Sequence, residues 1–86
     1  MSFHNDVSKS ALYRAGDVLR LFDGPFGDGV ILGFDDEDHA LVQRPYAYAS
    51  SVGTTGPTVL LGSERIVYRS VELPRFDKVG DKRTTT

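Results

Sequence analysis

The chain has 86 residues, no cysteine and a formal net charge of −2, from 10 basic and 12 acidic residues. This length predicts one domain with a small core, and the absence of cysteine excludes disulfides and thiolate metal sites. No stretch is long and apolar enough to span a membrane, and no signal-peptide pattern opens the chain. We therefore expect a cytoplasmic protein, or one assembled into a particle, with no membrane partner.

The charges are unevenly distributed along the chain. Residues 16–39 hold seven acidic residues and one arginine, a local charge of −6, whereas residues 63–86 hold six basic and four acidic residues, a local charge of +2. Proteins that bind nucleic acid usually present a strongly basic face. We therefore expect weak or no affinity for nucleic acid at physiological salt.

The first predicted element is an N-terminal arm over residues 1–15. Residues 8–14 could form one or two helical turns with a polar cap, although such short helices need packing to be stable. We expect Leu12 and Tyr13 to dock on the body of the protein.

Short strands follow, separated by turns rich in glycine, proline and aspartate. The alternation of apolar residues predicts strands over residues 18–22, 30–34, 39–44, 58–61 and 64–69. Gly62 and Ser63 are expected to form a turn between the last two strands, and Pro74 to end the body. The expected organisation is a body over 16–76 and a flexible tail over 77–86.

Five short strands without a long amphipathic helix indicate a small antiparallel barrel or sandwich. The same alternation predicts a core made of Leu19, Leu21, Val30, Leu32, Leu41, Ile66 and Tyr68. In the second strand the opposite face, which carries Ile31, remains an alternative.

The stretch Gly16-Asp17-Val18-Leu19-Arg20-Leu21-Phe22-Asp23-Gly24-Pro25-Phe26, followed by Gly29-Val30-Ile31, resembles the KOW motif. That motif occurs in SH3-like barrels of ribosomal proteins and NusG-type transcription factors. The resemblance covers residues 16–44 and implies an all-β fold, a small five-stranded SH3-like barrel with a flexible N-terminal arm and C-terminal tail. Family members on ribosomal RNA are basic here, whereas this hairpin is acidic. The resemblance therefore implies the fold and not RNA binding.

The densest ionisable cluster is Asp35-Asp36-Glu37-Asp38-His39. Its oxygens could bind a divalent cation, but it lacks the glycine spacing and the distant glutamate of a calcium loop. We expect a solvated turn. No Gly-x-Ser-x-Gly motif accompanies the two histidines, His4 and His39, and a strand follows the glycine-rich turn where a phosphate loop needs a helix. We therefore predict no catalytic residues, no metal site, no cofactor and no enzymatic activity.

The segment after the third strand carries the predicted partner-binding site. Alternation places Arg44, Tyr46 and Tyr48 on one face, and Arg and Tyr are enriched at protein interfaces. Pro45 lacks a backbone donor, so this stretch is expected at an edge. The alternative is that the tyrosines cover the core and a neighbouring loop.

Three functions are compatible with these residues. The first is a non-enzymatic interaction module, a small structural subunit of a larger complex such as a phage or virion component, which binds a protein partner or itself. The second is a KOW-like nucleic-acid-binding module that uses Arg65, Arg69, Arg75, Lys78, Lys82 and Arg83. The third is an oligomeric enzyme resembling the plasmid-borne dihydrofolate reductases, whose Val-Gln-Ile-Tyr motif Arg65-Ile66-Val67-Tyr68 matches loosely. We favour the first.

Overall fold

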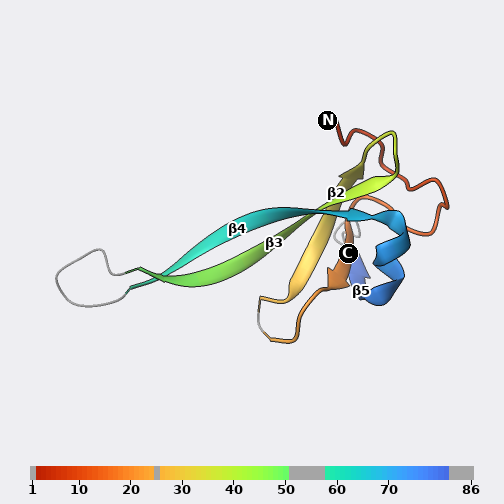
Figure 1. Cartoon of the computed structure of the whole chain (residues 1–86). Coiled ribbons are helices and arrows are strands. Elements are labelled where there is room, and N and C mark those ends of the chain that lie inside the picture. The colour runs from red at the N-terminus through yellow and green to blue at the C-terminus, as the bar shows by residue number, and fades with distance from the viewer. Residues whose placement is uncertain (1, 25, 51–57, 82–86) are drawn as a thin grey trace.

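The computed structural model describes residues 2–24, 26–50 and 58–81 and, for residues 46–50, 58–60 and 81, the backbone alone. The elements in chain order are β1 (Asp17–Arg20), β2 (Asp28–Phe34), β3 (His39–Ser50), β4 (Thr58–Arg69), the 3-10 helix η1 (Ser70–Arg75) and β5 (Asp77–Asp81) (Figure 1). No helix in the described part of the chain is long and apolar enough to cross a membrane.

All five strands belong to one antiparallel sheet, in the order β4-β3-β2-β1-β5. The predicted small all-β fold of five strands is confirmed. The sheet is not closed, because in the described residues no ladder joins its edges, β4 and β5. The rings of Tyr68 in β4 and Phe76 just before β5 instead meet edge to face, 5.1 Å apart between centroids. Side chains rather than backbone hydrogen bonds therefore link the two ends of the sheet.

The core lies where the inner face of the sheet meets η1. Its buried members are Leu19, Ile31, Phe34, Ala40, Val42 and Leu73, and the partly buried Tyr13, Leu21, Tyr68 and Phe76 pack against them. The predicted burial of Leu19 is confirmed, and Leu21 and Tyr68 touch the core as expected. In β4 the inner residues Ile66 and Tyr68 are partly buried, as the alternation predicts.

The predicted inner face of β2 is wrong. Leu32 is 39% exposed, whereas Ile31 is 1% exposed and pairs with the buried Val42 of β3. Val30 is only partly buried, and so is Leu41, next to the buried Val42. Both faces of β2 are apolar, so alternation along this strand could not distinguish the inner face from the outer one. The alternative with Ile31 in the core is correct.

Residues 77–81, predicted as part of a flexible tail, form β5 instead. This strand pairs with β1, with Leu19 opposite Lys78 and Val18 opposite Gly80. The ammonium of Lys78 lies 3.1 Å from the carboxylate of Asp17, which is fully buried. The strand pairing and this ion pair hold residues 77–81 against the body. Residues 82–86 of the predicted tail lie outside the described part of the chain.

The predicted turn at Gly62 and Ser63 is also wrong, because β4 runs through both residues without interruption. They pair with Tyr46 and Pro45 of β3, so the two predicted strands form one strand of 12 residues. The glycine is tolerated because a continuous partner strand provides the backbone hydrogen bonds.

The N-terminal residues form no helix in the described structure. They lie against the body as an irregular segment, with bridges from Asn5 to Phe34 and from Val7 to Arg14. Ala11 takes a left-handed φ of 62° in a turn closed by its own N–H and the carbonyl of Ser8. Tyr13 packs against the core as expected, whereas Leu12 is exposed.

Candidate functional site

A two-stranded arm projects from the body (Figure 1). β3 and β4 pair over all 12 residues, but the ladder between β2 and β3 ends at Gln43. Beyond it, seven β3–β4 pairs continue, from Arg44 opposite Glu64 to Ser50 opposite Thr58, and no third strand joins them in the described residues. Two-stranded ribbons are at best marginally stable in water. The arm therefore receives the fewest stabilising contacts from the rest of the sheet.

Beyond its first pair, Arg44 and Glu64, the arm has no charged residue. Residues 45–63, 19 in all, contain no Asp, Glu, Lys or Arg, although such residues make up 26% of the chain. Leu61, on the described part of the arm, is 71% exposed. Natural proteins usually place charges on exposed strands to prevent unwanted pairing. An uncharged ribbon is typical of a surface that becomes covered.

An ion pair lies at the base of the arm, between the two residues that flank the uncharged stretch 45–63. Arg44 of β3 contacts the carboxylate of Glu64, its pairing partner on β4. The guanidinium carbon lies 4.7 Å from the centre of the Phe22 ring, a cation–π contact. Nη1 donates to the carbonyl oxygens of Phe26, at 3.5 Å, and Pro45, at 3.3 Å. These contacts fix Arg44 at the junction of arm and body.

The Nε atom of Arg44 is buried and has no hydrogen-bond partner among the described residues. An unsatisfied buried donor costs about 1–3 kcal/mol, and native proteins contain few of them. Arg44 Nε is therefore an uncompensated donor at the base of the arm.

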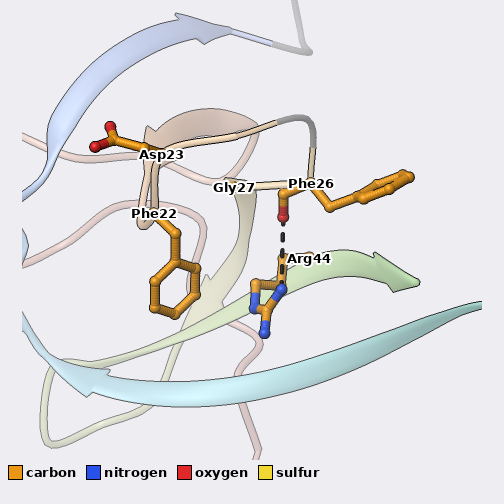
Figure 2. Close-up of a pocket in the computed structure, with 5 residues that line it drawn as sticks. All are labelled: Phe22, Asp23, Phe26, Gly27 and Arg44. Carbon is orange, nitrogen blue, oxygen red and sulfur yellow. Dashed lines mark hydrogen bonds between the residues drawn. The ribbon is translucent and has the colours of Figure 1, made fainter. Parts of the chain in front are cut away.

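Beside Arg44 a shallow pocket of about 340 Å³ opens, lined by Phe22, Asp23, Phe26, Gly27 and Arg44 (Figure 2). This volume is at the small end of ligand-binding pockets. Phe22 and Phe26 are 50% and 36% exposed. Figure 2 shows the Phe22 ring beside the guanidinium and the Phe26 ring pointing away from it.

The turn between β1 and β2 holds this pocket in shape. The N–H groups of Leu21 and Phe22 both donate to the carbonyl of Gly27, whose own N–H donates to Gly24. Gly24 has a left-handed φ of 113°, and a side chain at Gly27 would collide with the carbonyl oxygen of Phe22. Glycine is therefore required at both positions, which makes the pocket a preformed feature.

The predicted site residues are brought to one strand. Arg44, Tyr46 and Tyr48 all belong to β3 and pair with Glu64, Gly62 and Leu60 of β4. The side chains of Tyr46 and Tyr48 lie outside the described structure. Arg44 is partly buried and engaged at the arm's base rather than free on an exposed face. Pro45 lies just past the end of the β2–β3 ladder, as its missing donor led us to expect.

The acidic turn between β2 and β3 is organised by one carboxylate. Asp35 accepts hydrogen bonds from the backbone N–H groups of Glu37, at 3.0 Å, and His39, at 2.7 Å, and its other oxygen lies 3.0 Å from His39 Nδ1. Burial by itself raises the pKa of Asp35, but these hydrogen bonds and the charge of His39 outweigh it and lower the pKa below its ordinary value. Within the described residues no group of His, Asp and Glu has a metal-binding arrangement. Asp35 thus fixes the turn.

Sequence reasoning missed the pocket. Asp23 and Phe26 belong to a turn that the sequence indicates only as a change of chain direction, whereas Phe22 is predicted to end a strand, and Arg44 is far from all three in sequence. Two phenylalanines that flank a glycine-rich turn were the available signal, because large apolar residues in turns seldom find cover.

No protein-family model, curated protein or solved structure matches this chain. The KOW resemblance over residues 16–44 therefore stays a prediction.

Proposed function

We propose that this protein is a non-enzymatic assembly module whose β3–β4 arm is buried in a larger protein complex. The observation that carries the proposal is the arm itself: seven strand pairs without a third strand in the described structure, six of them within 19 consecutive uncharged residues. A ribbon of this kind gains stability when a partner covers it, and burial of its uncharged residues does not require any ion to lose its hydration. A virus particle or a cellular complex would equally provide such cover.

The charged residues favour a protein partner over nucleic acid. Four basic side chains of the described structure already contact carboxylates: Arg20 with Asp28, Arg44 with Glu64, Arg69 with Glu72 and Lys78 with Asp17. Arg65 donates to Gln43. Cations neutralised by neighbouring carboxylates release few counterions from a phosphate backbone, so they add little affinity for nucleic acid.

Removal of the arm tests the proposal. In the arm-deleted chain, residues 46–62 are replaced by Asn-Gly, which favours a two-residue hairpin turn between Pro45 and Ser63. The Arg44–Glu64 ion pair is retained. We expect the melting temperature of the body to be unchanged, whereas stoichiometric partners that co-purify with the tagged parent chain are lost. An arm-deleted chain that is folded and keeps the same partners at the same yield would overturn the proposal.

A double point variant tests the same surface without removing the ribbon. Tyr46→Ala with Tyr48→Ala should leave the fold intact and weaken association by at least about 2 kcal/mol if these residues are interface hot spots. Loss of folding would show instead that the tyrosines belong to the core, the alternative that the sequence left open.

A further inference from the structure

We propose that two copies of this chain pair through the outer edge of β4, antiparallel about a two-fold axis at Ser63, so that their sheets join into one. This inference rests on the proposed function, because it names the partner that covers the arm. β4 is an outer strand of the described sheet and pairs there with β3 on one side only. Its other side therefore offers backbone N–H and C=O groups to an incoming strand.

The edge of β4 lacks the features that usually keep edge strands apart, which are charges, proline, bulges and short length. In the described sheet the opposite edge, β5, has only five residues, three of them charged, and its pairing with β1 contains a register shift. The part of β3 that lies beyond its ladder with β2 begins with Arg44 and Pro45. By contrast, β4 has no proline, its first six residues are uncharged, and it keeps one register with β3 over 12 pairs.

The order of residues in β4 makes this edge complementary to itself. Residues directly opposite each other in a ladder point to the same face, so a two-fold pairing must be centred on one residue. A centre at Glu64 or Arg65 places like charges opposite each other. A centre at Ser63 pairs residues 58–68 of the two copies, 11 in all, with Arg65 opposite Leu61 and Glu64 opposite Gly62. Of the two-fold registers that keep like charges apart, this one pairs the most residues.

The same register covers apolar side chains that a single copy leaves in water. Leu61 is 71% exposed and Val67 is 50% exposed. In the dimer Leu61 lies beside Arg65 of the second copy, whose aliphatic stem can cover it, and Val67 is paired with Val59. Eleven paired residues form about eleven backbone hydrogen bonds. Residues 58–63 of each arm pair with residues 63–68 of the other copy, so each arm gains a third strand.

Cysteine cross-linking tests the register, because the chain has no cysteine of its own. Ser63 is exposed. In the dimer it lies opposite Ser63 of the second copy, with the two Cα atoms about 4.5–5.5 Å apart, which a disulfide can span. Ser63→Cys should therefore form a covalent dimer on mild oxidation, seen by non-reducing electrophoresis. Leu61→Cys is the matched control and should stay unlinked, because the two copies of residue 61 are offset by four residues, about 13 Å along the strand. Equal cross-linking of the two variants would overturn the register.

Charge substitutions at Leu61 test the same pairing without a covalent bond. Leu61→Lys places a cation opposite Arg65 at two equivalent contacts and should raise the Kd of the dimer at least about tenfold. Leu61→Glu places an anion there and should leave the dimer intact. Adding Arg65→Glu to Leu61→Lys should restore association. Sedimentation equilibrium measures each Kd, and Leu12→Lys, at an exposed residue outside β4, should dimerise like the parent.

The outcomes separate this inference from the proposed function. Melting temperatures establish that every variant is folded. A monomeric parent overturns the inference, yet leaves the proposed function standing if the arm captures a different protein. A dimer that Leu61→Lys and Leu61→Glu weaken equally also overturns it, because the charge of Arg65 then has no part in the contact. A dimer that the arm-deleted chain forms equally well overturns both, since another surface builds it.

Discussion

The body and the arm of this protein are built from the same two strands but are stabilised differently. In the body, β3 lies between β2 and β4, and its residues Ala40 and Val42 are fully buried. In the arm, β3 and β4 have only each other in the described structure. The comparison teaches that one continuous hairpin can serve two purposes: its proximal half completes a core, and its distal half offers an uncharged surface. The stability of the body should therefore not depend on the arm.

The largest expected difference between the regions is the cost of removing an apolar side chain. Phe34 is 1% exposed, and Phe34→Ala should lower the free energy of unfolding by about 3–5 kcal/mol through lost burial and a cavity. Leu61→Ala on the arm should change it by no more than about 0.5 kcal/mol, because that side chain is already in water. Urea denaturation measures both. Equal costs would mean that the arm contributes to the core.

The second prediction concerns the junction of β1 and β5, on the opposite side of the body from the arm. The buried carboxylate of Asp17 accepts the N–H of Arg14 at 2.9 Å and contacts Lys78. Asp17→Ala should cost about 2 kcal/mol, because it leaves buried donors unpaired. Lys78→Met should cost less, since the Lys78 side chain is about half exposed and its ion pair with Asp17 is weakened by water. Hydrogen exchange should show β5 opening first in Asp17→Ala; protection equal to that of the parent would contradict this role.

The third prediction uses pH to test the acidic turn that precedes β3. Asp35 has a lowered pKa in the folded state, so it stabilises the fold at pH values above its unfolded pKa, and this stabilisation is lost as the pH falls through the folded pKa. The melting temperature of the parent should therefore decline steeply below about pH 4. Asp35→Asn should lower the melting temperature at pH 7 and flatten the decline. An unchanged slope for this variant would show that the turn is held by other groups.

The smallest expected effect concerns backbone strain at Ala11, in the N-terminal segment. Ala11 has a left-handed φ of 62°, where a β-carbon is strained. Ala11→Gly should relieve that strain and, after the added flexibility of the unfolded chain, stabilise the protein by about 0.5 kcal/mol. Ala15→Gly is the matched control and should destabilise by a similar amount. Thermal melts of the two variants should shift in opposite directions; shifts of the same sign would contradict the strain at Ala11.

The sequence by itself predicted those features that depend on neighbours along the chain. Its turn residues and alternating apolar positions indicated an all-β fold, and the alternation in β4 correctly separated Ile66 and Tyr68 from Arg65, Val67 and Arg69. Pro45 correctly marked the point beyond which β3 loses β2 as a partner. Local backbone chemistry and a two-residue period are sufficient for such predictions.

Only the tertiary structure decided which residues meet across the chain. Ile31 rather than Leu32 is buried because pairing with Val42 sets the inner face of β2. Residues 77–81 become a strand because β1 offers them a free edge and a buried carboxylate, neither of which their own composition reveals. Arg44 reaches Phe22 and Phe26 only because the β1–β2 turn folds back beside β3. Pairing partners and pockets are set by long-range packing, which no local pattern encodes.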